Sequence, residues 1–281
     1  MRKKLFAVFA VLVIALTVVI PAGAITGGQP DGDGHPNGAL VLVPGISFCS
    51  GTLIDEDVVL TAGHCTDFFT NPGDDLTIDE VWVSFDSEAS VDLDTWQVTG
   101  GTWYLSHSWA THPDYDAAVW PFTADYGIVF LDEAVTGLTP AALPEPNVVD
   151  ELIGTTGQTA QRFMDVGYGQ NGVVVGGGFP IGNFDFTRKY SIQRYNPSNG
   201  SVGTQYPLWL ILGNAPSPNK GAGCGGDSGS GIYPAGEDTV VAVHTGGYRL
   251  GYLAQICGRI TSLNHRVDLP IVLDWLEPYL D

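Results

Sequence analysis

Basic residues are scarce in this sequence. Its 281 residues hold 11 Lys and Arg against 31 Asp and Glu, so the formal net charge is −20 at pH 7. A surface of this sign repels the phosphates of nucleic acids and the headgroups of anionic membranes. The shortage of bases therefore argues against a nucleic-acid-binding or membrane-surface protein. We interpret the acidic excess as a solvation feature that says little about substrate.

Long apolar runs are also lacking, with one exception at the start of the chain. Residues 5–20 are almost entirely apolar and follow the basic residues Arg2, Lys3 and Lys4. This run is shorter than the ~20 residues that cross a bilayer, and Ala-Gly-Ala at 22–24 has the small-x-small pattern of a signal peptidase site. We therefore predict a signal peptide over 1–24, a secreted (extracellular) protein beginning at Ile25, and no membrane span after cleavage; a membrane anchor is the alternative.

Cysteine is sparse, and no Cys-x-x-Cys motif occurs. The four cysteines are Cys49, Cys65, Cys224 and Cys257. An even number in an exported protein favours disulfides, although spacing alone permits three pairings. Only His64 adjoins a cysteine, so the close ligand spacing of a zinc site is missing. We expect disulfides and no metal bound by these residues.

Helical periodicity is rare, and 37 glycines interrupt the chain. Short β-branched or aromatic runs, bounded by Gly, Pro, Asn and Asp, predict strands instead. They fall into two sets, separated by a Pro- and Ala-rich linker at 139–149: 39–43, 50–54, 58–61, 81–85 and 128–131, then 163–166, 208–212, 229–233, 239–244 and 259–262. One helix is predicted near the end, where Val272, Trp275, Leu276 and Tyr279 recur at helical spacing. The pattern indicates an all-β protein in two halves.

Two local segments carry residues suited to catalysis. Thr-Ala-Gly-His-Cys at 61–65 places His64 at the end of an apolar strand, and Gly-Gly-Asp-Ser-Gly-Ser-Gly at 225–231 places Ser228 in a glycine-crowded turn. Glycine there frees the backbone and lets a substrate carbonyl approach main-chain N–H groups. Taken alone, a histidine is more often structural, and a Gly-x-Ser-Gly segment is a common turn. Only the two segments together, in this order, indicate a catalytic site.

These segments resemble the Thr-Ala-Ala-His-Cys and Gly-Asp-Ser-Gly-Gly signatures of the chymotrypsin/trypsin-like serine proteases, in a bacterial-type secreted form. The resemblance extends to Ile-Thr-Gly-Gly at 25–28, Phe-Cys-Ser-Gly-Thr-Leu-Ile at 48–54 and Val-Gly-Tyr-Gly at 166–169. It implies an all-β fold of two antiparallel six-stranded β-barrels packed together, with a C-terminal α-helix. The expected ranges are 25–140 for the first barrel, 141–265 for the second and 266–281 for the helix.

The resemblance also implies the catalytic roles. Ser228 would be the nucleophile of an acyl-enzyme mechanism, His64 its general base, and the N–H groups of Gly226 and Ser228 the oxyanion hole. The order His, Asp, Ser is that of the family. Asp-Tyr-Gly-Ile-Val-Phe-Leu at 125–131 matches the family's acid, with His-Pro-Asp-Tyr at 112–115 as its upstream landmark, so Asp125 is the predicted acid and Asp116 the alternative.

The expected activity is that of a secreted, monomeric serine endopeptidase acting on protein or peptide substrates. A catalytically silent secreted binding protein on the same scaffold is the alternative. The family's pairing implies the disulfides Cys49–Cys65, near the histidine, and Cys224–Cys257, beside the specificity pocket. It also implies an ion pair between the freed α-amino group of Ile25 and Asp227, which orders the oxyanion loop. Signal-peptide cleavage alone would create that amine; a simple strand lead-in at 25–28 is the other interpretation.

The pocket residues that the family uses leave substrate preference open. Ala222 stands at the pocket floor, where basic-specific members carry Asp, and no acid replaces it at Gly258, so Arg or Lys specificity is not expected. Gly246 and Gly258 fit open pocket walls and a bulky apolar side chain. His244 resembles the histidine of glutamate-specific bacterial relatives, although those relatives carry a hydroxyl residue where this chain has Gly223. Both an apolar and a Glu preference remain.

An acidic segment lies where some relatives bind calcium. It contains Asp74, Asp75, Asp79 and Glu80, whose oxygens suit the ion but whose spacing matches no recognised calcium loop. We expect a solvated acidic face and no cofactor, with calcium as the alternative.

Overall fold

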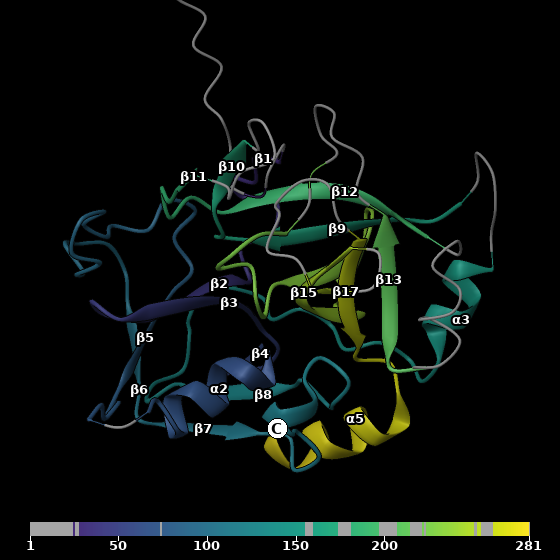
Figure 1. Cartoon of the computed structure of the whole chain (residues 1–281), viewed down its shortest axis with the longest axis horizontal. Helices are drawn as coiled ribbons and strands as arrows, with labels where there is room; N and C mark the ends of the chain where they lie inside the picture. Colours follow the sequence, from purple (N-terminus) through teal and green to yellow (C-terminus); the bar gives the residue numbers. More distant parts are fainter. Residues whose placement is uncertain are drawn as a thin grey trace, which may run out of the picture.

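The strands predicted from β-branched runs form two separate sheets. The computed structural model describes residues 25, 28–73, 75–154, 160–173, 181–196, 207–213, 221, 223–249, 252–253 and 261–280. Figure 1 shows the first sheet in purple to teal and the second in green to yellow, side by side. The predicted signal peptide, residues 1–24, lies outside the described residues.

The first sheet closes on itself. Its order is β6-β5-β2-β3-β4-β8-β7, and all of its pairings are antiparallel. The strands are β2 (Gly38–Val43), β3 (Ser47–Leu53), β4 (Val58–Thr61), β5 (Val81–Ser84), β6 (Tyr104–Ser106), β7 (Ser108–Thr111) and β8 (Gly127–Phe130). The two end strands, β6 and β7, are consecutive in the chain with only His107 between them. One bent segment therefore closes a barrel of six chain passes.

The second sheet closes through β9, which pairs with both β12 and β14. The ring consists of β9 (Arg162–Gly167), β12 (Lys189–Tyr195), β13 (Trp209–Gly213), β17 (Thr261–Arg266), β15 (Ala242–Arg249) and β14 (Gly231–Pro234). Outside the ring, β16 (Tyr252–Leu253) pairs with β15, and β10 (Asn171–Val173) pairs with β11 (Ile181–Asn183). The prediction of two antiparallel six-stranded barrels is thus confirmed.

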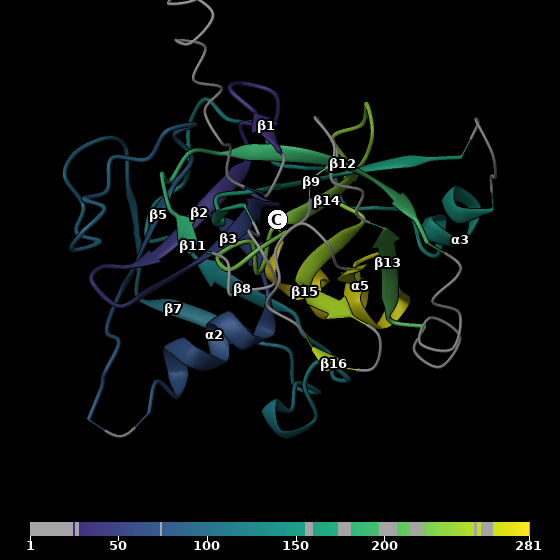
Figure 2. The same cartoon turned by 45° about the horizontal axis from the view of Figure 1, so that its top comes forward.

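The start of the described chain joins the second barrel. β1 (Gln29–Pro30) falls in the range predicted for the first barrel, yet it pairs with β12 (Figure 2). The chain therefore crosses from one barrel to the other before β2 begins. The exact barrel boundaries stay predictions.

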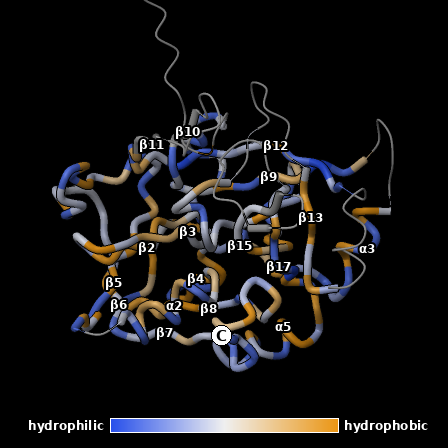
Figure 3. Tube along the Cα trace, in the orientation of Figure 1, coloured by the Kyte–Doolittle hydropathy of each residue, from blue (hydrophilic) through white to orange (hydrophobic). Residues whose placement is uncertain are grey.

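β2 is buried on both faces, which explains its unbroken apolar sequence. Ala39, Val41 and Val43 point into the main core, whereas Leu40 and Leu42 pack in a second cluster with aromatic residues. Complete burial of one such side chain contributes about 1.5–3 kcal/mol. The hydropathy of the trace follows this arrangement, with apolar residues concentrated on the barrel strands (Figure 3).

Helices are short and few among the described residues. α2 (Gly63–Thr70) and α3 (Val148–Ile153) were not predicted, because eight and six residues are too few for a helical period to show. The predicted C-terminal helix is present as α5 (Pro270–Leu276), continued by the 3₁₀ turn η4 (Glu277–Tyr279). It starts later than the predicted residue 266 because β17 runs to Arg266. No helix in the described part of the chain has the length and apolarity needed to cross a membrane.

α5 packs on the first barrel, although it follows the second in sequence. Val272 and Leu276 are fully buried in the main core cluster with Leu60 and Ile128. The rings of Trp275 and His112 lie 4.9 Å apart. The C-terminal helix therefore fastens the end of the chain beneath the first barrel (Figure 1).

Candidate active site

Two paired strands bring His64 and Asp125 together. β4 ends at Thr61, and α2 begins two residues later with His64 in its first turn. Asp125 lies just before β8, and Thr61 is the register partner of Gly127. Gly63 makes this approach possible, because a Cβ there would lie 2.9 Å from the backbone N and O of Tyr126.

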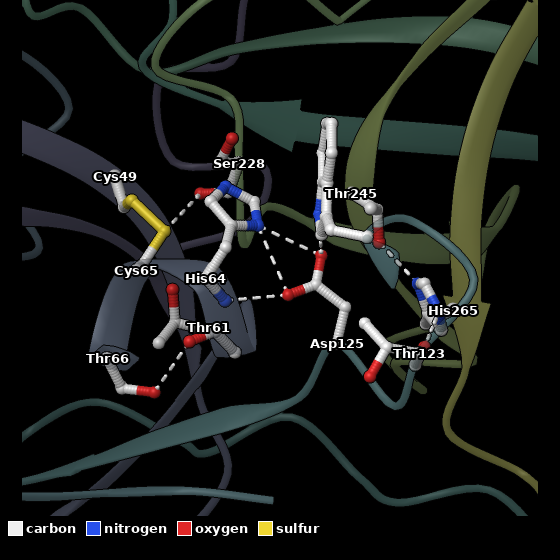
Figure 4. A network of polar contacts seen from close by, with 12 residues as sticks. Cys49, Thr61, His64, Cys65, Thr66, Thr123, Asp125, Ser228, Thr245 and His265 are labelled. Carbon is white, nitrogen blue, oxygen red and sulfur yellow. Dashed lines mark hydrogen bonds and ion pairs between the residues drawn. A yellow bond between two sulfur atoms is a disulfide. The ribbon is translucent and has the colours of Figure 1, made fainter. Parts of the chain in front are cut away.

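The carboxylate of Asp125 is fully buried against His64. Its Oδ1 accepts a hydrogen bond from the backbone N of His64 at 2.7 Å, and its Oδ2 lies 2.9 Å from His64 Nδ1 (Figure 4). Burial raises the pKa of Asp125, but the attraction and hydrogen bonds of His64 outweigh it and lower that pKa to about 2. An ionised acceptor at this position keeps the proton on Nδ1 and leaves Nε2 free to accept another.

Asp116 has a different local role. Its side chain caps the 3₁₀ turn η1 (Ala117–Val119) and accepts a hydrogen bond from Ala118 N at 2.9 Å. Of the two candidate acids, the structure places Asp125 and not Asp116 against His64.

Ser228 lies beside the ring of His64, at the edge away from Asp125 (Figure 4). Its loop is fixed from both barrels, because Ser50 N of β3 donates to Ser228 O at 2.8 Å and Gly229 N donates to His244 O of β15 at 2.8 Å. Ser228 Oγ has no hydrogen bond to the described residues. Catalytic hydrogen bonds are often loose before substrate binds, so this geometry is compatible with a nucleophile and base.

The glycines around Ser228 are required by the turn. Gly226 has φ +94°, and a Cβ there would lie 2.3 Å from the Phe48 ring. Within the described chain, no residue accepts a hydrogen bond from the backbone N of Gly226 or of Ser228. The assignment of these two donors to an oxyanion hole stays a prediction.

Asp227, the predicted partner of Ile25, is fully buried below this loop. Its carboxylate accepts hydrogen bonds from Gly169 N at 2.7 Å and Cys224 N at 2.8 Å. Burial and the nearby Asp165 raise the pKa of Asp227 to about 7. Ile25 is also fully buried, but its nitrogen is an uncharged peptide amide in this uncleaved chain. The ion pair stays a prediction for the cleaved form.

The Cys49–Cys65 disulfide is confirmed, with its Cα atoms 6.5 Å apart. It joins β3 to α2 directly beside His64 and so anchors the helix that carries this histidine. Cys224 is also disulfide-bonded, and its predicted partner Cys257 lies outside the described residues.

Two of the four predicted pocket residues, Ala222 and Gly258, lie outside the described residues. Gly246 is described, and a Cβ there would lie 3.6 Å from the ring of Trp120. The backbone at Gly223 covers the ring of His244, because a Cβ on that glycine would lie 2.2 Å from His244 Cε1.

His244 is buried and paired with an acid. Its Nδ1 lies 3.3 Å from Asp165 Oδ2 and 3.2 Å from Ser262 Oγ. Burial alone would lower the pKa of His244, but Asp165 raises it above its usual value overall. The pair thus stabilises an imidazolium beneath the loop that carries Ser228.

Sequence reasoning missed three residues near His64 and Asp125: Trp120, Thr245 and His265. Trp120 Nε1 donates to Asp125 Oδ2 at 3.1 Å. The Thr245 hydroxyl contacts His265 Nδ1, and His265 Nε2 lies 2.7 Å from Thr123 O. Burial lowers the pKa of His265 to about 4, so its ring is neutral at pH 7. Only the closeness of Trp120 to Asp125 in the sequence could have indicated a role.

The acidic segment shows separate contacts instead of a shared ligand cluster. Asp75 and Asp79 are exposed, and Glu80 accepts from Trp82 Nε1 at 3.0 Å. Asp74 lies outside the described residues. Where the chain is described, the group that brings three potential ligand atoms within 4.8 Å is Cys49, His64 and Cys65, whose sulfurs are joined in a disulfide. The expectation of no cofactor, with calcium as the alternative, stays a prediction.

Two sequence comparisons relate this chain to known proteins. The family model described as Trypsin matches residues 25–162. Lectizyme from Glossina austeni is 30% identical over 170 residues, which cover 55% of this chain and 57% of Lectizyme. The chain thus spans little more than half the length of that curated relative.

Solved structures share the fold. The structure titled HL collagenase has a TM-score of 0.58 at 16% identity, covering 87% of this chain and 93% of its own. The structure titled HBP has a TM-score of 0.58 at 21% identity, covering 90% and 95%. At these identities the two structures establish the architecture alone.

Proposed function

Since this chain belongs to the chymotrypsin/trypsin-like serine protease family, we propose that it is a secreted serine endopeptidase with His64, Asp125 and Ser228 as its catalytic triad. One observation carries the proposal. The buried carboxylate of Asp125 is bonded to both the backbone N and Nδ1 of His64, and Ser228 lies at the other edge of that ring.

The geometry supports the following sequence of steps. Ser228 Oγ attacks the scissile carbonyl while its proton passes to His64 Nε2, and the resulting oxyanion is stabilised by the N–H groups of Gly226 and Ser228. The C–N bond then breaks, His64 protonates the leaving amine, and an acyl-enzyme remains. Water repeats the steps and releases the acid. Loss of one oxyanion donor typically costs about 3 kcal/mol of transition-state stabilisation.

Covalent labelling tests the proposal. Diisopropyl fluorophosphate needs an activated serine but little from a specificity pocket. We expect the secreted protein to gain one adduct, located on Ser228 by peptide mass spectrometry, and Ser228→Ala to gain none. A folded wild-type protein that stays unlabelled would favour the alternative of a silent binding protein on the same scaffold.

We propose that the enzyme does not prefer Arg or Lys before the cleaved bond and takes a Glu or an apolar side chain. A Glu preference would depend on His244, whose imidazolium is stabilised by Asp165 and could attract a carboxylate held over the Gly223 backbone that covers the ring. Peptides that differ only at this residue should then show Asp165→Asn losing about tenfold in the Glu-to-Phe ratio of kcat/KM, or ~1.4 kcal/mol. An unchanged ratio would leave the apolar preference and a purely structural His244.

We further propose that signal-peptide cleavage itself activates the enzyme by freeing the amine of Ile25. With the nitrogen in an amide, the raised pKa of Asp227 means that its contribution to stability is full below about pH 4 and is lost as pH rises through about 7. An amine paired with Asp227 should lower that pKa and remove the loss until the amine itself deprotonates above ~8.

Urea unfolding between pH 4 and 9 checks this expectation. For a chain that begins at Ile25, the free energy of unfolding should stay constant up to neutral pH. For a matched chain with one extra residue before Ile25, the free energy of unfolding should fall between pH 4 and 7. Parallel curves for the two chains, or a secreted protein with a different first residue, would contradict the activation proposal.

A further inference from the structure

The carboxylate of Asp125 has one donor besides His64 among the described residues. This donor is Nε1 of Trp120, 3.1 Å from Asp125 Oδ2. We propose that Trp120 is a positioning residue that holds Asp125, and through it His64, in the orientation needed for catalysis. The inference rests on the proposed function of the triad.

The two oxygens of Asp125 have different hydrogen-bond partners. Oδ1 accepts from the backbone N of His64 at 2.7 Å, whereas Oδ2 lies 2.9 Å from His64 Nδ1 and accepts from Trp120. The first contact fixes one oxygen to the rigid start of α2. The Trp120 bond gives the second oxygen a partner in addition to His64 Nδ1, so that rotation of the carboxylate would break hydrogen bonds to both residues. Hydrogen bonds to a buried charged group are among the stronger ones in proteins.

The indole also contacts the ring that Asp125 orients. The Trp120 and His64 rings are 5.7 Å apart at an interplanar angle of 72°, an edge-to-face arrangement. At its far side the indole lies near Gly246 of β15, where a Cβ would be 3.6 Å from its ring atoms. Trp120 therefore reaches from the acid and histidine of the first barrel to a strand of the second.

The loop that carries Trp120 is firmly anchored. Thr123 Oγ1 accepts from Asp116 N at 2.6 Å and donates to Asp114 O at 2.9 Å. Thr123 O is bound by His265 from the second barrel, and the ring of Phe122 lies 5.2 Å from that of Trp209. Because its loop is held in place by these contacts, the Trp120 indole can hold the carboxylate of Asp125 in position.

The hydroxyl of Thr245 on β15 does not share this task. Thr245 directly follows His244 on β15, and its Oγ1 is hydrogen-bonded to His265 Nδ1 instead of to Asp125. The hydrogen bond from Trp120 is therefore the support that the second oxygen of Asp125 receives from outside His64.

Trp120→Phe tests this role, because phenylalanine keeps an aromatic ring but lacks the N–H. Trp109→Phe is the matched control, since Trp109 Nε1 donates to Thr70 Oγ1 at 3.0 Å, away from Asp125. With diisopropyl fluorophosphate, Trp120→Phe should label Ser228 ten- to hundredfold more slowly at saturation. The reagent concentration at half-maximal rate should stay within twofold, and Trp109→Phe should label at the wild-type rate.

A second measurement does not depend on activity. In an indole ¹H–¹⁵N spectrum, the resonance absent from Trp120→Phe should shift when Asp125 is replaced by Asn, while the resonance of Trp109 stays in place. If Trp120→Phe labels as fast as Trp109→Phe, or if the Trp120 resonance ignores Asp125→Asn, the positioning role is wrong. A wild-type protein with this shift but without labelling would instead refute the proposed function.

Discussion

Asp125→Asn should lower the rate of peptide hydrolysis by about 10⁴-fold while the protein stays folded, the size of loss seen when the acid of a Ser-His-Asp triad is made neutral. The reason lies in the two contacts of this side chain. The Asn oxygen can still accept from the backbone N of His64, which turns its NH₂ group toward Nδ1. The imidazole must then carry its proton on Nε2, where it can no longer accept the proton of Ser228.

Steady-state hydrolysis of an amide substrate measures this effect, with thermal unfolding as the check on folding. Asp116→Asn is the control, because that carboxylate only caps η1 and should change kcat less than twofold. A larger loss from Asp116→Asn than from Asp125→Asn would reverse the assignment of the acid.

Gly229→Ala should be the most destabilising single methyl group near the site. The backbone of Gly229 has φ +87°, and a Cβ would lie 2.1 Å from Thr61 Oγ1 and 2.2 Å from Ser50 O. Left-handed strain costs about 1–3 kcal/mol and an overpacked core a further ~1–3 kcal/mol. The two terms sum to about 2–6 kcal/mol, so at roughly 2–4 °C per kcal/mol for a chain of this size Tm should fall by about 4–24 °C.

Gly236→Ala isolates the strain from the clash. Gly236 has φ +92°, almost the same as Gly229, but nothing lies within 4 Å of its added Cβ. Its substitution should therefore cost about 1 kcal/mol, from the left-handed backbone alone. Equal losses of Tm in the two variants would mean that the Thr61 and Ser50 contacts do not constrain the loop.

The strand pattern predicted an all-β protein in two halves, because strands buried on one or both faces have recognisable local sequences, such as the apolar run at 39–43. The two barrels were predicted from the family resemblance. The sequence also indicated His64 and Ser228. The backbone on one side of each of them is too crowded for a side chain, so that neighbouring position is a glycine, which can be recognised in the sequence. The sequence did not indicate Trp120. Its role depends on a hydrogen bond across a folded loop, and a single tryptophan forms no recognisable pattern in the sequence.

The same limit applies to His244 and Asp165. They are far apart in the chain, on β15 and β9, and the pairing of both strands with β14 brings them to 3.3 Å. Sequence analysis named His244 from a resemblance but had no means of finding the acid behind it. Pairs made by tertiary structure alone have to be read from coordinates.

The placement of α5 has a consequence for the order in which the two barrels can be completed. Val272 and Leu276 complete the core that supports β4 and β8, the strands from which His64 and Asp125 project. A segment that begins only after β17, the last strand of the second barrel, has ended at Arg266 is thus needed to complete the core of the first barrel. The first barrel, with His64 and Asp125, can therefore be completed only after the last strand of the second barrel has been synthesised.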